Sequence, residues 1–182
     1  NAVTRSWVGL DNYRVLFQTP AFRLAARNTL RFTGICIPIL ICVSLFISVF
    51  LQRQKRLRSL LKSAFLLPMA VPVASVVLLW RVTFHADGFL SLLAVHTGHA
   101  AADWMNTGYA FWVLVFSYIW KNLGYNIVLW TAGLSGIPYH LYEAARIDGA
   151  GEWACFRKIT LPGLKPVLYT ITVLSLLNSF KV

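Results

Sequence analysis

The chain has 182 residues, of which 58% are hydrophobic, and its mean hydropathy is +0.63. This apolar fraction exceeds the roughly 45–50% of soluble domains, so it argues against a water-soluble fold. A net charge of +11 would suggest a nucleic-acid partner in a soluble chain. Here much of the positive charge lies beside long apolar runs, so a lipid bilayer accounts for it and no nucleic acid is expected.

The first 29 residues precede the first long apolar run, and they are predicted to form an extracytoplasmic or interfacial segment. Leu10, Tyr13 and Phe17 share one face of a helix, with polar residues off that face. This pattern is typical of helices that lie in the membrane interface. The chain begins at Asn1 without a methionine and stops at Val182, so we expect a fragment that is truncated at both ends.

Four apolar runs are each long enough to cross a bilayer, which takes roughly 20 mainly apolar residues. Hydrocarbon offers no water to unpaired backbone groups, and the runs lack the period-two alternation of barrel strands, so each is predicted to be a helix. The predicted fold class is all-α, a polytopic membrane helical bundle. The transmembrane domain is expected over residues 30–182, with spans at about 30–51, 64–84, 109–134 and 164–180.

The distribution of basic residues predicts the orientation of these spans. Residues 52–63 contain several Lys and Arg and no acid, whereas residues 85–108 contain Asp87 and Asp103 and no Lys or Arg. By the positive-inside rule, loops 52–63 and 135–162 are cytoplasmic and loop 85–108 is outside. The arginines among the first 29 residues oppose this orientation, but we expect a further span before Asn1, and the first helix often dominates. These opposing residues are Arg5, Arg14, Arg23 and Arg27.

Neither a metal site nor a catalytic centre is expected. The cysteines are too few and too scattered for a disulfide framework. His96 and His99 are three residues apart but lack an acid or cysteine partner at ligand spacing. The acids and histidines of residues 85–108 match no catalytic pattern, so an enzymatic activity of the chain itself is not predicted.

The second span contains Pro68 and Pro72, each of which removes a backbone donor and clashes with the carbonyl one turn back. A kinked helix is therefore expected. Prolines are tolerated in membrane helices generally, and a broken helix can also border a moving pathway, so both interpretations stay open.

The third span contains Lys121, Asn122 and Asn126, which should face the bundle interior, because a lipid-facing lysine costs about 2.5–3.5 kcal/mol. The two asparagines are one turn apart on one helix face. Amides beside aromatic rings suit a hydroxyl-rich ligand, although interhelical hydrogen bonding explains most intramembrane asparagines. The candidates for the substrate pathway are Trp120, Asn122, Tyr125, Asn126 and Asn178.

The connection between the third and fourth spans, residues 135–163, predicts two short helices that meet at a glycine turn. Pro138 suits the first helical position, and Gly149 suits the left-handed position that ends a helix. A second helix is expected over about 151–159, terminated by Pro162. Small residues at Ala144 and Ala145 leave a surface that can fit closely into a groove of a partner.

This connection carries a spaced motif: EAA at 143–145, three residues, Gly149, nine residues, then ITLP at 159–162. The motif resembles the cytoplasmic signature of permease subunits of binding-protein-dependent ABC importers. The resemblance extends to VGLDNY at 8–13, NTLRFT at 28–33, LLPMAVP at 66–72 and WKNLGYN at 120–126, which look like the sugar and glycerol-phosphate branch.

The resemblance implies the permease core of a type I ABC importer, coupled through this loop to a separate cytoplasmic ATPase dimer. No phosphate-binding loop occurs in the sequence, so ATP and Mg are expected on the partner and no cofactor on this chain. Further implied partners are a second permease subunit, in a heterodimer with a homodimer remaining open, and an extracytoplasmic substrate-binding protein. The implied ATPase-coupling residues are Glu143, Ala144, Ala145, Asp148 and Gly149.

The predicted function is therefore import of a sugar or polyol, with glycerol phosphate left open, across a bacterial or archaeal cytoplasmic membrane. The alternative is a secondary transporter driven by an ion gradient. Such a transporter would need intramembrane carboxylates or a coupling-ion site, and the four predicted spans contain no Asp or Glu.

Overall fold

The structure is a computed structural model that describes residues 9–54, 58–100 and 103–180. Every element in these ranges is a helix or a helical turn, which confirms the all-α prediction. Part of the basic loop and the ends of the chain, including Arg5, Lys55, Arg56 and Lys181, lie outside the described residues.

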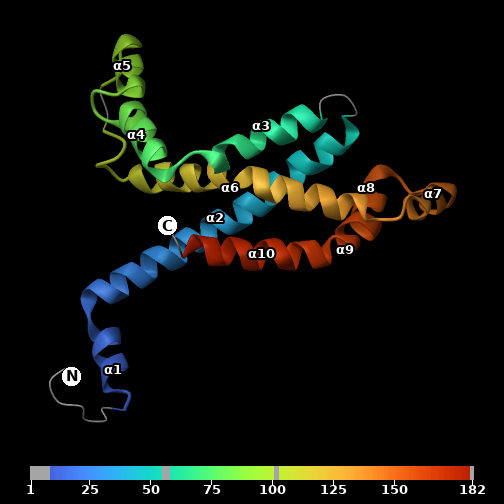
Figure 1. Cartoon of the computed structure of the whole chain (residues 1–182), viewed down its shortest axis with the longest axis horizontal. Coiled ribbons are helices and arrows are strands. Elements are labelled where there is room, and N and C mark those ends of the chain that lie inside the picture. Colours follow the sequence, from blue (N-terminus) through green and yellow to red (C-terminus); the bar gives the residue numbers. More distant parts are fainter. Residues whose placement is uncertain (1–8, 55–57, 101–102, 181–182) are drawn as a thin grey trace.

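The helices follow one another with short connections (Figure 1). Their bounds are α1 Asp11–Gln18, α2 Pro20–Arg53, α3 Arg58–Ala70, α4 Val73–Phe84, α5 Phe89–His96, α6 Ala110–Ser135, α7 Tyr139–Ile147, α8 Glu152–Cys155, the π-helical turn η1 Phe156–Thr160, α9 Leu161–Gly163 and α10 Lys165–Ser179.

Helix α6 is the centre of the bundle and packs most extensively against α2 and α3. In Figure 1, α10 returns alongside α6 in the opposite direction, and α4 and α5 turn away from the start of α6. One core cluster joins α2 to α6, and a second joins the end of α6 to α10. The buried members are Phe32, Cys36, Leu40, Val115 and Tyr118 in the first and Trp130, Leu134, Leu164 and Ile171 in the second.

Polar and small residues also hold these helices together, as is usual where lipid replaces water as the solvent. The indole nitrogen of Trp130 donates to the hydroxyl of Ser44 at 3.0 Å, which joins α6 to α2. A Cβ added at Gly124 would collide with the backbone carbonyl of Phe65. The glycine in the WKNLGYN stretch therefore allows α3 and α6 to touch backbone to backbone.

The predicted second span is broken, as its prolines indicated. Helix α3 ends at Ala70 and α4 begins at Val73, with Pro72 extended between them. By length and composition, two segments of the described chain could cross a membrane, Pro20–Gln52 and Val73–His96, and a third is the pair Glu152–Gly163 and Lys165–Ser179, bent by 61°. Four spans and their orientation remain a prediction.

Candidate functional site

The connection between α6 and α10 forms a helical hairpin, with α7 as one arm and α8 with η1 as the other. Helix α7 begins one residue later than predicted, because Pro138 has an extended ψ of 129° and acts as the N-cap. The φ of −61° that the proline ring fixes suits both the N-cap and the first helical position, so the ψ of Pro138 decides where the helix starts. The carbonyl of Pro138 accepts the N–H of Leu141 at 3.2 Å.

Gly149 ends α7 in the predicted left-handed conformation, with φ of +78°. The N–H of Ala150 donates to the carbonyl of Ala145 at 2.8 Å, and the N–H of Gly149 donates to that of Arg146 at 3.0 Å. These two bonds are the Schellman motif, which satisfies the last carbonyls of the helix. The turn therefore reverses the chain tightly enough to place α8 beside α7.

The prediction that Pro162 terminates the second arm is wrong. The chain stays helical through η1 and α9 to Gly163, and the break falls at Leu164. In η1 the N–H of Leu161 donates to the carbonyl of Phe156, five residues back. The wider π turn gives the ring of Pro162 room against the preceding turn, so the helix passes through the proline.

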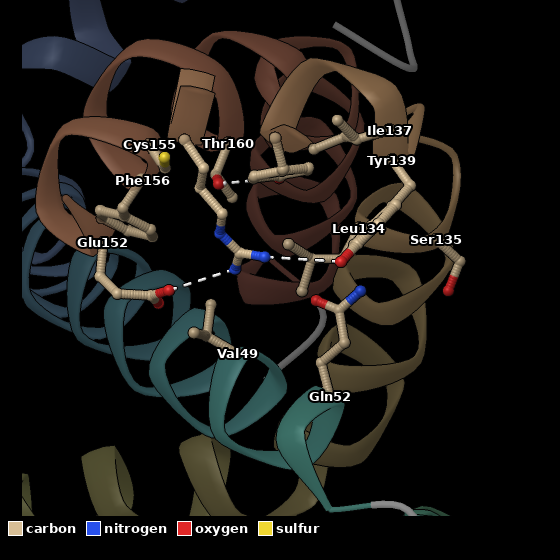
Figure 2. Close-up of a pocket in the computed structure, with 12 residues that line it drawn as sticks. Val49, Gln52, Leu134, Ser135, Ile137, Tyr139, Glu152, Cys155, Phe156 and Thr160 are labelled. Atoms are coloured by element: carbon tan, nitrogen blue, oxygen red, sulfur yellow. Dashed lines mark hydrogen bonds and ion pairs between the residues drawn. The ribbon is translucent and has the colours of Figure 1, made fainter. Parts of the chain in front are cut away.

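Two polar contacts tie α7 to the second arm, as Figure 2 shows for the ion pair and the buried hydroxyl. The hydroxyls of Tyr142 and Thr160 lie 2.9 Å apart, and Thr160 is buried. Arg146 donates to the hydroxyl of Tyr139 at 3.4 Å and to Oε1 of Glu152 at 3.3 Å. These partners, Tyr139 first, raise the pKa of Arg146 above its usual value. We call this set the hairpin clasp.

The arms of the hairpin and the ends of α2 and α6 line an open pocket of about 530 Å³ (Figure 2). Its wall combines aliphatic, aromatic and polar side chains from segments far apart in the sequence. The lining residues are Val49, Gln52, Leu134, Ser135, Ile137, Tyr139, Tyr142, Arg146, Glu152, Cys155, Phe156 and Thr160. The hairpin is therefore supported by its clasp rather than by a dry apolar core.

The outer face of α7 carries the residues predicted to couple to a partner. Glu143, Ala144, Asp148 and Gly149 are exposed and Ala145 is half-buried. Within the described part of the chain, Glu143 makes no hydrogen bond or ion pair. Figure 1 shows α7 at the far end of the molecule, projecting away from the bundle, so this face is open to a partner.

The exposed apolar side chains of the hairpin extend this face. Ile147 next to Asp148 is 86% exposed, and Trp153 on the second arm is 72% exposed. Surfaces of this kind, apolar and flanked by charged residues, are typical of protein contacts.

The predicted pathway residues do not form one cluster. Asn126 is 2% exposed and donates weakly to the hydroxyl of Ser175 on α10 at 3.5 Å. Asn122 donates to the carbonyl of Tyr118 in its own helix at 2.8 Å, which is a local bond. Asn178 lies half-buried on α10, and Tyr125 is half-buried on α6. The hydrogen bond of Asn126 to Ser175 therefore joins α6 to α10.

Trp120 lies on another side of α6, against α4. Its ring is 5.5 Å from that of Trp80, which also contacts Phe84 and Phe116. The indole N–H of Trp80 is buried and has no hydrogen-bond partner among the described residues. We did not single out Trp80 from the sequence, and an aromatic residue within an apolar run gives no signal that would have marked it.

The hairpin clasp was also missed. Tyr142 and Thr160 are separated by 18 positions, and no periodic pattern links them. Their pairing follows from the turn at Gly149, which fixes the register of the two arms. Sequence reasoning located the turn but not the side-chain contacts that the turn creates.

Comparison with known proteins places the chain among membrane transport components. Residues 40–181 match the family model described as binding-protein-dependent transport system inner membrane component. The arabinooligosaccharides transport system permease protein AraP of Bacillus subtilis (strain 168) is 35% identical over 97% of this chain and 57% of its own length. The sn-glycerol-3-phosphate transport system permease protein UgpA of an Escherichia coli strain is 34% identical over 96% of this chain and 59% of its own length.

Among solved structures, the fold is similar to that of a bacterial ABC transporter involved in the import of the acidic polysaccharide alginate. The TM-score is 0.85 with 24% identity, over 100% of this chain and 65% of that one. A bacterial alginate ABC transporter in complex with an alginate pentasaccharide-bound periplasmic protein gives 0.81 with 23% identity, over 92% of this chain and 60% of that one. The chain spans less than two thirds of the length of each of these proteins.

Proposed function

The chain belongs to the family of binding-protein-dependent transport system inner membrane components, and we propose on this basis that it is the permease subunit of an ATP-driven importer. This is a family of transport components, not of enzymes. The proposed location is the bacterial or archaeal cytoplasmic membrane, crossed several times, with the α7 hairpin on the cytoplasmic side.

The proposed substrate is a sugar or a polyol, with a glycerol phosphate as the specific alternative. Support comes from the relatives, whose names specify arabinooligosaccharides and sn-glycerol-3-phosphate. The pathway would run beside α6 and α10, where Asn126 and Ser175 place polar atoms inside the bundle. Trp120, Asn122, Tyr125 and Asn178 remain candidates for this pathway.

The observation that carries the coupling proposal is the exposed outer face of α7. Glu143, Ala144, Ala145, Asp148 and Gly149 would dock into a cleft of a separate ATPase subunit, which binds ATP and Mg. The small side chains permit close approach, and Glu143 has its polar capacity available to the partner. The further proposed partners are a second permease subunit, most simply in a heterodimer, and an extracytoplasmic binding protein.

We propose alternating access as the mechanism. ATP binding would close the ATPase dimer and displace α7, and the hairpin clasp would transmit this displacement to the second arm. That arm continues into α10 through the 61° bend, so moving the hairpin tilts α10 relative to α6. A loaded binding protein would favour one state by its differential affinity, which couples the two sides energetically.

An ion-gradient-driven transporter is not favoured. Such a mechanism would need intramembrane acids or a coupling-ion site, and the described helices α2, α3, α4, α6 and α10 contain no Asp or Glu.

The test is substrate-stimulated ATP hydrolysis by the full-length complex in liposomes, with Gly149→Asp compared to wild type. At φ of +78° a side chain is strained, so the turn that sets the hairpin should distort. Gly151→Asp is the matched control, because Gly151 has a φ of −72° and open space around its Cβ position, and Asp suits the N-cap that it occupies.

If the Gly149→Asp complex assembles but loses its response to loaded binding protein while Gly151→Asp keeps it, the hairpin is the coupling element. Unchanged stimulation and uptake in both variants would show that the hairpin is only a connector.

A further inference from the structure

The elbow between α1 and α2 contains an open groove of about 620 Å³ that takes no part in the proposed transport mechanism. Its floor is apolar, formed by Phe17, Phe22, Ala26 and Leu30. The rings of Phe17 and Phe22 meet edge to face at 5.4 Å, which fixes the two helices at the corner. Leu30 is 72% exposed, so the groove is open along the side of α2.

Three arginines line the rim of this groove. Arg23, Arg27 and Arg31 recur at every fourth position of α2 and therefore share one helix face. Nε of Arg23 donates to the carbonyl of Phe17 at 2.7 Å, which holds the guanidinium over the elbow with its terminal nitrogens available. Arg27 makes no hydrogen bond or ion pair with any described residue.

The third arginine, Arg31, lies over the ring of Phe111 on α6, with its guanidinium carbon 4.5 Å from the ring centre. This contact anchors it to the bundle. The only acid in residues 9–54 is Asp11, which has no ion pair with the described residues. The rim therefore keeps its positive charge.

The length of α2 places this rim at a membrane surface. Its 34 residues extend about 51 Å, whereas a hydrocarbon core is about 30 Å thick. If residues 32–51 fill that core, Arg31 lies at its boundary. Arg27 then lies about 6 Å farther out, within the headgroup layer, and Arg23 lies about 12 Å farther out, on the aqueous side of that layer.

We propose that this elbow binds an anionic phospholipid of the adjacent leaflet, the outer one in the predicted orientation. The phosphate would accept hydrogen bonds from Arg27, with Arg23 adding positive charge on its aqueous side. The glycerol backbone would lie over Ala26, and one acyl chain would enter the hydrocarbon core along Leu30. A cationic rim above a wholly apolar floor matches an amphiphile. An acidic protein surface would satisfy the rim but leave the floor unfilled.

The neighbouring helix supports the same occupant. Leu10 and Tyr13 on α1 are 77% and 61% exposed, so an apolar surface continues from the groove along an interfacial helix. The site also accounts for Arg23 and Arg27, two of the four arginines that oppose the positive-inside rule, because a bound anionic lipid compensates their charge.

The experiment is native mass spectrometry of the full-length permease complex after equilibration in vesicles of equal parts phosphatidylglycerol and phosphatidylcholine. Wild type should retain phosphatidylglycerol preferentially. In the double variant Arg23→Gln/Arg27→Gln, the preference for phosphatidylglycerol over phosphatidylcholine should fall about five-fold for each arginine removed. Ala26→Phe fills the groove, so it should lower the amount of retained lipid. Arg14→Gln is the matched control, since Arg14 is an exposed arginine of α1 outside the groove, and it should behave as wild type.

The proposal would be overturned if wild type retained phosphatidylglycerol no better than phosphatidylcholine, or if the double variant kept the same preference as wild type. It would also be overturned if Arg14→Gln lost the preference as strongly as the double variant. Unchanged lipid retention together with weaker capture of the extracytoplasmic binding protein would assign the arginines to a protein contact instead. Retention is measured without ATP or substrate, so this result is independent of the proposed transport function.

Discussion

The membrane bundle and the hairpin are stabilised in opposite ways. In the bundle, Trp130 and Ile171 are at most 1% exposed, and backbone touches backbone at Gly124. In the hairpin, Ile147 is 86% exposed, and the arms are held by a few polar contacts around an open pocket. A tightly packed region resists deformation, whereas a region held by few contacts can be displaced by a partner.

Substitutions in the two regions should therefore separate folding from coupling. Changes inside the bundle should reduce stability of the whole subunit, because they disturb contacts shared by several helices. Changes in the hairpin should leave the bundle folded but reduce the coupling between the subunit and the ATPase.

Replacing Gly124 by alanine should have the largest effect. The added Cβ would overlap the backbone carbonyl of Phe65, and backbone atoms cannot rotate away, so α3 and α6 must separate. Overpacking typically costs about 1–3 kcal/mol, and this site should lie at or above the upper end. Thermal stability of the detergent-purified subunit, followed by size-exclusion chromatography, provides the measurement.

Gly34→Ala on α2 is the control for Gly124, because nothing lies within 4 Å of its Cβ position. It should leave the melting temperature unchanged or raise it slightly through helix propensity. Equal melting temperatures for the two variants would contradict the close approach of α3 and α6.

Truncating Ile171 to alanine should have the next largest effect. This side chain is fully buried in the cluster that joins α6 to α10, so its removal leaves a cavity. Because lipid is as apolar as the bundle interior, the truncation loses mainly packing contacts and little hydrophobic free energy. We therefore expect the free energy of unfolding to fall by about 2 kcal/mol, at the lower end for such truncations. Thermal unfolding checks this, with Val173→Ala on the exposed side of α10 as control. A larger shift for Val173→Ala would reverse the assignment of the packed face.

The contrast also explains what the sequence could predict. Helices and the break near Pro72 follow from apolar runs and backbone chemistry, and Gly149 was predictable because few residues tolerate its torsion. The continuation through Pro162 was not, since the π turn depends on how η1 packs. Likewise the spacing of Trp120 and Asn126 places them on different sides of α6, but it does not specify that Trp80 and Ser175 are their neighbours there.

Tyr142→Phe should affect coupling more than stability. It removes the hydroxyl 2.9 Å from Thr160 and leaves the buried Thr160 hydroxyl without this partner, at a local cost of about 1 kcal/mol. The arms should then move less strictly together, so substrate-stimulated ATP hydrolysis should fall while basal hydrolysis holds and the melting temperature falls by no more than about 2–4 °C. Tyr169→Phe on the exposed side of α10 is the matched control.

A double-mutant cycle with Thr160→Val sharpens this test. If the two hydroxyls act through each other, Tyr142→Phe should add little once Thr160 is replaced, because the contact is already lost. Fully additive losses of stimulation would show that Tyr142 acts through another contact, and the clasp would not transmit the motion.

The smallest effect is expected for Arg146→Gln. Arg146 and Glu152 have side chains 53% and 70% exposed, and ion pairs between such exposed groups contribute little. Because the pKa of Arg146 is raised above its usual value, the guanidinium stays protonated near neutrality, and its own titration should produce no pH dependence there. We expect stimulated hydrolysis to fall less in Arg146→Gln than in Tyr142→Phe. The difference between Arg146→Gln and wild type should shrink at high salt, because salt screens the wild-type ion pair. Arg146→Gln could instead abolish stimulation at all salt concentrations. The exposed ion pair, rather than the buried hydroxyl contact, would then hold the hairpin. In that case the hairpin would not be held as lightly, relative to the packed bundle, as its exposed contacts indicate.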